Sequence, residues 1–136
     1  MHSTRTDATV LIIDDEPEIR HVVRSALRST VARVIDAADG HTGLAAVRAQ
    51  TPDLIVLDLG LPDQSGLDLC RSIRAYSLAP IVVLTARHIE SDKVALLNAG
   101  ADDYVTKPFS TSEFAARVAA QIRRARTARP GTSGGV

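Results

Sequence analysis

The fold is decided by a stretch near the start of the chain, residues 10–15, which read VLIIDD. Four apolar residues in a row are typical of a β-strand that is covered on both faces in a parallel sheet. Residues 54–57 (LIVL) and 81–84 (IVVL) repeat this pattern, and we therefore expect these three runs to be the central strands. A mixed run at residues 31–35 and a short one at residues 104–105 complete a set of five.

Amphipathic stretches separate the five apolar runs. Apolar residues recur at helical spacing from Ile19 to Leu27, behind Pro17, and proline is common in the first turn of a helix. Four further stretches carry apolar residues at helical spacing, and the last of them begins with Ser110-x-x-Glu113, a capping-box pattern. Strands that alternate with helices predict an α/β fold, a (βα)5 doubly wound domain with a parallel five-stranded sheet.

Length and composition fit one domain of ordinary globular character. The chain has 136 residues, of which 45% are hydrophobic and 24% are charged. No apolar run approaches the ~20 residues of a membrane span, so we expect no contact with a membrane. A polar N-terminus without a signal-peptide pattern and a single cysteine, Cys70, indicate a cytoplasmic protein without disulfides. Residues 1–7 are expected to be a flexible N-terminus.

The net charge of zero hides an uneven distribution. All sixteen acidic residues lie in residues 1–113, and five of the sixteen basic residues follow them. These C-terminal arginines have no aromatic residues among them, which favours a solvated helix end over a nucleic-acid surface. We therefore do not expect this domain to bind DNA by itself.

Residues capable of specific chemistry follow four of the five apolar runs. In an open parallel sheet, ligands bind outside the carboxyl ends of the strands, near the point where the strand order reverses. These ends carry three carboxylates, one hydroxyl and one ammonium, from Asp14, Asp15, Asp58, Thr85 and Lys107. Neighbouring carboxylates repel one another unless a cation lies among them, and Mg²⁺ prefers oxygen ligands of this kind. We therefore expect a Mg²⁺ site where these residues converge.

Each of these residues also has a purely structural interpretation. The acidic pair could cap the following helix, Asp58 could be a solvated loop residue, and Thr85 could be a β-branched strand residue. Lys107 stands out because the chain has fourteen arginines and only two lysines, although it could also serve as an ion-pair partner of the acids. The Lys107-Pro108 peptide could be cis, which would direct the lysine inward.

Together, these positions resemble the full site of a response-regulator receiver domain, over about residues 8–126. The run GADDYVTKPF at residues 100–109 further resembles the OmpR/PhoB-type subfamily of transcriptional regulators. Residues 57–63 (LDLGLPD) and the stretch of residues 85–93 are most similar to the Kdp-type regulators of potassium-transport genes.

The resemblance implies a CheY-like fold with strand order 2-1-3-4-5 and a signalling role in place of enzyme activity. Asp58 would accept a phosphoryl group from a sensor histidine kinase and form an acyl phosphate. Asp15, Asp58 and the main-chain carbonyl of Gly60 would bind Mg²⁺, and Asp14 would act through water.

The same resemblance implies a switch. Thr85, Ala86 and Lys107 would bind the phosphoryl oxygens, and movement of Thr85 would draw Tyr104 inward. The face formed by the fourth helix, the fifth strand and the fifth helix would then form a symmetric homodimer. Three charge pairs are expected across that dimer: Lys93 with Glu113, Asp103 with Arg117, and Asp102 with Arg124. Subfamily members continue into a winged-helix domain, so residues 127–136 are expected to be a linker toward an absent C-terminal domain that would bind DNA.

Three alternatives use a related fold or related chemistry. A flavodoxin-like cofactor binder would need hydroxyls and amides after its first strand, where this chain has three acids. A phosphoaspartate phosphatase would place its nucleophile and a second acid two residues apart after one strand. The third alternative is a receiver-like interaction module that works without phosphorylation.

Overall fold

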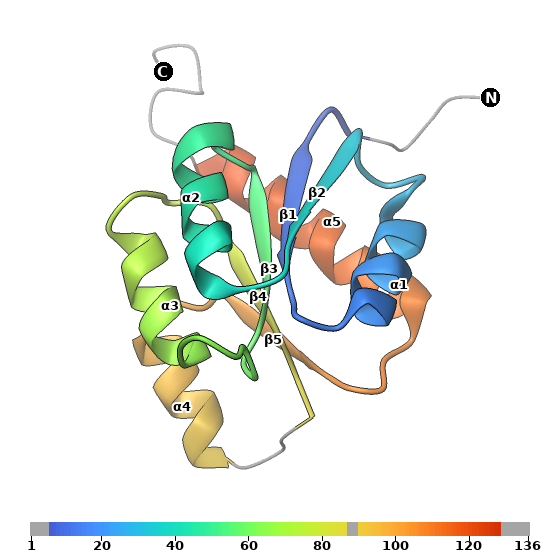
Figure 1. Ribbon diagram of the computed structural model, residues 1–136. Helices are drawn as coiled ribbons and strands as arrows, with labels where there is room; N and C mark the ends of the chain where they lie inside the picture. Colours follow the sequence, from blue (N-terminus) through green and yellow to red (C-terminus); the bar gives the residue numbers. More distant parts are fainter. Residues whose placement is uncertain (1–5, 87–89, 129–136) are drawn as a thin grey trace, which may run out of the picture.

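The computed structural model describes residues 6–86 and 90–128, in which five strands alternate with five helices (Figure 1). In chain order they are β1 (Thr9–Ile13), α1 (Pro17–Leu27), β2 (Arg33–Ala37), α2 (Gly40–Gln50), β3 (Leu54–Asp58), α3 (Gly66–Arg74), β4 (Ile81–Thr85), α4 (Glu90–Asn98), β5 (Asp103–Thr106) and α5 (Thr111–Ala128). The described residues do not include residues 1–5 of the expected N-terminal end, the expected linker from residue 129 onward, or Arg87. None of the described helices is long and apolar enough to cross a membrane.

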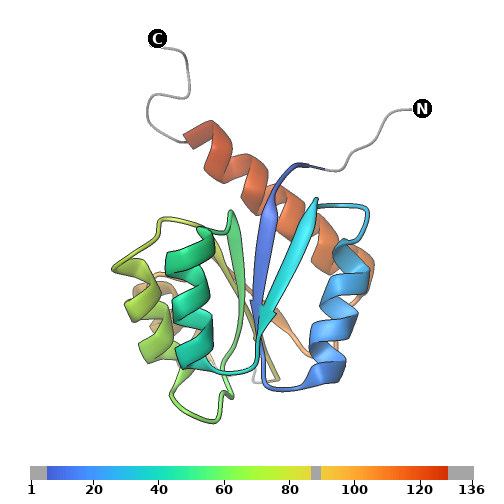
Figure 2. The same cartoon turned by 45° about the horizontal axis from the view of Figure 1, so that its top comes forward.

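The strands form one parallel sheet in the order β2-β1-β3-β4-β5, which confirms the predicted fold. Helices α1 and α5 cover one face of the sheet, and α2, α3 and α4 cover the other (Figure 2). β1 pairs with β2 on one side and with β3 on the other, so the strand order reverses at β1. The carboxyl ends of β1 and β3 are therefore the place where a doubly wound sheet binds its ligand.

Two hydrophobic cores hold the helices against the sheet. Successive residues of a strand point to opposite faces, so Leu11 and Ile13 pack in the core beneath α2, α3 and α4. Val10 and Ile12 pack in the other core, together with Phe114 of α5. All residues of β3 and β4 are buried, as are all but the first of β1, which confirms these three as the central strands.

The second strand begins later than its apolar run predicts. We expected a strand over Val31–Ile35, whereas β2 covers Arg33–Ala37. The Val31 amide donates to the Leu27 carbonyl (3.1 Å), so this buried residue completes the turn after α1 instead of starting the strand. β2 lies at the edge of the sheet, and an edge strand that is incompletely covered tolerates polar residues.

Two helices begin where the sequence predicts. Pro17 is the first residue of α1, and the Ser110 hydroxyl accepts the Glu113 amide N–H (3.2 Å) at the start of α5. The Glu113 carboxylate pairs with Arg117 (3.2 Å), one turn further along α5. α5 continues to Ala128, so the first two residues of the expected linker are helical.

The first described residues are attached to the domain. The Thr6 amide donates to the Thr30 carbonyl (2.8 Å), and the Asp7 carboxylate pairs with Arg126 of α5 (2.8 Å). Two residues that we expected within the flexible N-terminus therefore belong to the folded domain.

Arg74, at the end of α3, connects the segments that lead into β4 and β5. Its Nε and Nη2 atoms donate to the Gly100 carbonyl (3.0 and 2.8 Å), and its Nη1 donates to the Ala79 carbonyl (2.6 Å). Nη2 also pairs with the Asp102 carboxylate (2.7 Å). A planar guanidinium can direct donors at all these acceptors, whereas a lysine ammonium is a single point charge.

We expect Arg74→Lys to lower the free energy of unfolding by about 2 kcal/mol, because several main-chain carbonyls lose a donor. Urea denaturation measures the change. Arg71→Lys is the matched control on the same helix, since Arg71 is exposed and pairs only with Asp68 among the contacts of the described residues. That control should change stability by less than about 0.5 kcal/mol, and equal losses in the two variants would contradict the role of Arg74.

Candidate functional site

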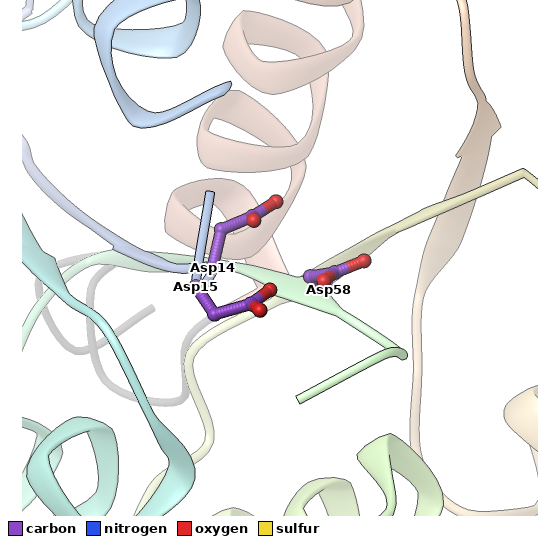
Figure 3. Close-up of side chains that lie close together, drawn as sticks. All are labelled: Asp14, Asp15 and Asp58. Atoms are coloured by element: carbon purple, nitrogen blue, oxygen red, sulfur yellow. The ribbon is translucent and has the colours of Figure 1, made fainter. Parts of the chain in front are cut away.

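Three aspartates gather at the carboxyl ends of β1 and β3 (Figure 3). Asp14 and Asp15 follow the last residue of β1, and Asp58 is the last residue of β3. One carboxylate oxygen from each of the three lies within 4.8 Å of the others. The structure therefore brings together the acids that the sequence predicted would converge.

Lys107 supplies the positive charge at this cluster. Its Nζ lies 3.1 Å from Asp58 Oδ1, 3.6 Å from Asp14 Oδ2 and 3.5 Å from Glu16 Oε1. Burial disfavours the charged ammonium, but Asp58 and Asp14 outweigh this effect and raise the pKa of Lys107 above its ordinary value. The Lys107-Pro108 peptide is cis. One ammonium thus faces several carboxylates, which leaves the site with an excess of negative charge.

Asp14 is the most deeply buried member of the cluster, with no exposed surface. Its Oδ1 accepts the Glu16 amide N–H (2.9 Å), while its Oδ2 has no hydrogen-bond partner within the described part of the chain. Burial raises the pKa of Asp14 to about 6, with the Glu16 amide opposing the shift and the Asp58 charge adding to it. A buried carboxylate oxygen without a donor is the kind of group that a hard cation or its water ligands would satisfy.

An open cavity of about 520 Å³ lies over the cluster. Its polar lining includes Asp15, Asp58 and Lys107, and the other residues assigned to the site, Gly60, Thr85 and Ala86, line it as well. Asp15 is exposed, whereas Asp58 and Thr85 are almost completely buried. The cavity therefore gives a small anionic group access to Asp58, Lys107 and the end of β4.

Two residues that the sequence analysis did not assign to the site contact it. Glu16 adds a third carboxylate beside Lys107. Arg20 of α1 donates to the main-chain carbonyl of Asp14 (2.7 Å) and so holds the segment after β1 in place. The run of three acids at residues 14–16 was a signal for Glu16, whereas Arg20 resembles any other arginine on an exposed helix face.

A comparison with protein families identifies the family to which the chain belongs. The model of the response regulator receiver domain matches residues 10–119. The chain belongs to the response regulator receiver family. A flavodoxin-like cofactor binder and a phosphoaspartate phosphatase are thereby excluded as its family.

Relatives of this receiver domain include transcriptional regulators. It is 50% identical over 115 residues to the transcriptional regulatory protein KdpE of Mycobacterium tuberculosis. This match covers 85% of the present chain and 51% of the relative. It is 48% identical to the KDP operon transcriptional regulatory protein KdpE of Escherichia coli K12, with the same coverage. The DNA-binding response regulator MtrA of Mycolicibacterium smegmatis is 45% identical, over 85% of this chain and 50% of that protein. The chain thus spans about half the length of the curated relatives it matches.

Solved structures of receivers share the fold. A putative response regulator from Chloroflexus aurantiacus has a TM-score of 0.80 and 34% identity, over 86% of this chain and 98% of that one. The BeF3-activated receiver domain of RstA from Klebsiella pneumoniae has a TM-score of 0.79 and 28% identity, over 85% and 98% of the two chains. The receiver domain described here is thus of the KdpE/OmpR type in sequence and CheY-like in structure.

Five of the six residues expected at a dimer face have side-chain partners within the receiver domain. Arg117 binds both oxygens of Asp103 (3.0 and 3.1 Å) as well as Glu113. The Lys93 ammonium lies 5.0 Å from the ring centroid of Tyr104, which is half-buried on β5.

The remaining expected pair, Asp102 with Arg124, lies at the other end of this face. Asp102 accepts the Ile81 amide N–H (2.9 Å) and pairs with Arg74. Arg124 is exposed on α5 and lines the same surface cavity as Asp102. The carboxylate of Asp102 therefore has a structural role within the domain.

The raised pKa of Asp14 predicts a pH-dependent stability. The folded domain holds a proton on Asp14 more tightly than the unfolded chain does, so stability rises as the pH falls through about 6. In metal-free protein, this group should add about 1 kcal/mol to the free energy of unfolding between about pH 7.5 and pH 5.

Asp14→Asn should remove that pH dependence and raise stability near neutral pH by about 1–3 kcal/mol, because the buried charge is gone. Urea denaturation in the presence of a chelator at both pH values provides the measurement. Asp15→Asn, at an exposed position, serves as the control. If the pH dependence of Asp14→Asn matched that of the unsubstituted protein, the assignment of the shift to Asp14 would be wrong.

Proposed function

We propose that this receiver domain accepts a phosphoryl group on Asp58 from the phosphohistidine of a sensor histidine kinase, in a Mg²⁺-dependent reaction. The observation that supports it most directly is the position of Asp58, which lines an open cavity, contacts the Lys107 ammonium and lies close to two further carboxylates. The phosphorylated domain would then control the output of a transcriptional regulator of the KdpE type. The resemblance to Kdp-type regulators implies genes of potassium transport as its targets, and one relative is named a transcriptional regulator of the KDP operon.

The reaction needs a carboxylate that is ionised, oriented and accessible. Asp58 Oδ1 accepts a hydrogen bond from the Lys107 ammonium (3.1 Å), which orients the carboxylate. In the transfer, an oxygen of Asp58 forms a bond to phosphorus while the bond from phosphorus to the histidine nitrogen breaks. The electron pair of that bond remains on the imidazole, and the product on Asp58 is an acyl phosphate.

The residues around Asp58 fit a bound Mg²⁺ ion. Asp15 and Asp58 would provide oxygen ligands, and Asp14, whose Oδ2 is buried without a hydrogen-bond donor within the described residues, would act through a water ligand. Gly60 lies beside them, since a Cβ atom added to it would be 3.7 Å from Asp58 Oδ2, and its carbonyl is the proposed third direct protein ligand. A bound Mg²⁺ would offset the repulsion among these carboxylates and the charge of the incoming phosphoryl group.

The other residues of the cavity are suited to bind the phosphoryl oxygens. Lys107 and the hydroxyl of Thr85 would contact two of them, with the Ala86 amide as a further donor. Engagement of Thr85 at the end of β4 would leave space toward Tyr104 on the neighbouring strand β5. A shift of Tyr104 would alter its contact with Lys93 and so change the face formed by α4, β5 and α5.

The decisive test is intact mass spectrometry after incubation with acetyl phosphate and Mg²⁺. We expect one phosphoryl adduct that is lost on treatment with hydroxylamine and is absent when Mg²⁺ is chelated. Asp58→Asn should abolish the adduct, whereas Asp68→Asn, an exposed control on α3, should keep it. A stable fold without any adduct in the unsubstituted protein would favour the interaction module that works without phosphorylation.

We further propose that phosphorylation favours a symmetric homodimer through the face of α4, β5 and α5. In the unphosphorylated domain, Arg117 and Asp103 bind each other, so intermolecular pairs would require these side chains to exchange or share partners. Exposed ion pairs contribute only about 0–1 kcal/mol each, and they should therefore set the register of a dimer more than its affinity.

A charge swap between Lys93 and Glu113 tests this dimer. Each single reversal, Lys93→Glu or Glu113→Lys, should weaken the dimer of the beryllofluoride-treated protein by up to about fivefold, and the double variant should recover part of the loss. Sedimentation velocity measures the association. Glu113→Gln removes the negative charge without reversing it and should weaken the dimer less. A double variant no better than the worse single one would count against this interface.

A further inference from the structure

The loop between β3 and α3, residues 59–65, is attached to α2 by a carboxylate outside the cation site. Asp63 in this loop uses both of its oxygens, which accept the amide N–H groups of Gly40 and His41 at 2.9 Å each. These two amides belong to the first turn of α2, where helical amides have no partner within the helix. The two N–H groups lower the pKa of Asp63 below its ordinary value, because they stabilise the charged carboxylate.

A second carboxylate caps the same helix but makes no hydrogen bond to the loop within the described part of the chain. Asp39, the residue before α2, accepts the Thr42 amide N–H with its side chain (2.7 Å). The first turn of α2 therefore uses one acid from its own segment and one from the loop after β3. Asp39 and Asp63 both accept main-chain N–H groups at the start of α2, but only Asp63 also connects this helix to the loop.

Close packing reinforces the contact on both sides of the loop. A Cβ atom at Gly40 would lie within 2.5–2.8 Å of the Gln64 side chain, so the absence of one lets Gln64 lie over the start of α2. At the other end, a Cβ atom at Gly66 would lie 2.8 Å from the Cα of Leu59, so the loop backbone lies directly against the first residue of α3. The loop is thus enclosed between the starts of two helices.

α2 also packs against the strand that carries the other acids. A Cβ atom at Gly43 would lie 2.6 Å from the Cδ1 of Ile13, the residue that precedes Asp14. One short helix therefore contacts the end of β1 and, through Asp63, the loop that follows Asp58. Through α2, the position of the loop that contains Gly60 is therefore coupled to the position of Asp14 and Asp15 after β1.

We propose that Asp63 is a positioning residue for the cation site. By attaching the loop to the first turn of α2, it holds Gly60 at the place beside Asp14, Asp15 and Asp58 that Mg²⁺ binding requires. This inference rests on the proposed function, because it assumes that the three acids and the Gly60 carbonyl bind Mg²⁺. Residues that orient the ligands of a metal without touching it commonly contribute 10–100-fold to its affinity.

The test compares Asp63→Ala with Asp39→Ala, since each removes one cap of α2 and only the first releases the loop. Isothermal titration calorimetry with Mg²⁺ alone should show about 10-fold weaker binding in Asp63→Ala, while Asp39→Ala should bind as the unsubstituted protein does. Asp63→Asn, which keeps one acceptor oxygen and loses the charge, should fall between them.

Hydrogen exchange gives a readout that does not depend on the metal. In metal-free protein, Asp63→Ala should speed exchange at the amides of residues 59–61 as well as at Gly40 and His41. Asp39→Ala should speed it at Thr42 and leave the loop unchanged. Urea denaturation of both variants checks that each remains folded and shows how far each loss of a cap destabilises the domain.

The possible outcomes separate the inference from the proposed function. If the unsubstituted protein binds Mg²⁺ and Asp63→Ala binds it equally well, Asp63 is a helix cap only and the inference is wrong, whereas the proposed function stands. Equal losses of Mg²⁺ affinity in Asp63→Ala and Asp39→Ala would also overturn it, because stability of α2 alone would then explain the effect. Failure of the unsubstituted protein to bind Mg²⁺ would overturn both.

Discussion

The parallel pairing of β1 with β3 brings Asp14 and Asp58 to the same end of the sheet, beside Asp15. Like charges at such short range in a partly buried setting raise the free energy of the metal-free fold. The pKa of Asp14 is raised mainly by burial, and the Asp58 charge adds to the shift. Lys107 offsets part of the repulsion by contacting two of the three aspartates. The remaining negative charge is what makes the cavity suitable for a divalent cation and, with it, for a phosphoryl group.

The geometry of the cluster depends on contacts outside it. Arg20 donates to the carbonyl of Asp14 from α1, and Asp63 attaches the loop after Asp58 to α2. These contacts come from helices on opposite faces of the sheet, so the two helical layers both contribute to the placement of the acids. A site at the edge of a sheet can therefore be rigid although its residues follow the strands and lie in loops.

In the proposed switch, a change at Asp58 would reach the face formed by α4, β5 and α5. Thr85 at the end of β4 lies in register with Thr106 of β5, and Tyr104 lies two residues earlier on that strand. Lys93 and Arg117 already have aromatic or acidic partners within the domain. A dimer through this face must therefore draw on side chains that change partners, which suits a switch with a small free-energy difference between its states.

Three features could be predicted from the amino-acid sequence alone: the order of the strands and helices, the three central strands, and the position of the acids at the carboxyl ends of the strands. Continuous apolar runs specify burial on both faces of a strand, and the rules for parallel sheets place the residues that follow such runs at one edge. The family could also be recognised by resemblance, because five chemically distinctive residues lie at or just after the ends of four strands. These features depend on the local pattern of apolar residues and on the order of strands and helices, and both can be read from the amino-acid sequence.

Three features of the site depend on tertiary contacts: the oxygen of Asp14 that lacks a hydrogen-bond donor among the described residues, the acids that contact Lys107, and the partners of Asp102. The apolar run at residues 31–35 could not reveal that Val31 closes a helical turn, because apolar character reports burial and not hydrogen bonding. Arg20, Arg74 and Asp63 look like ordinary surface residues in the sequence, and their roles follow from contacts across 6 to 28 positions of the chain. Burial, side-chain direction and long-range contact arise only when the helices pack on the sheet, and for that reason the sequence pattern alone does not contain them.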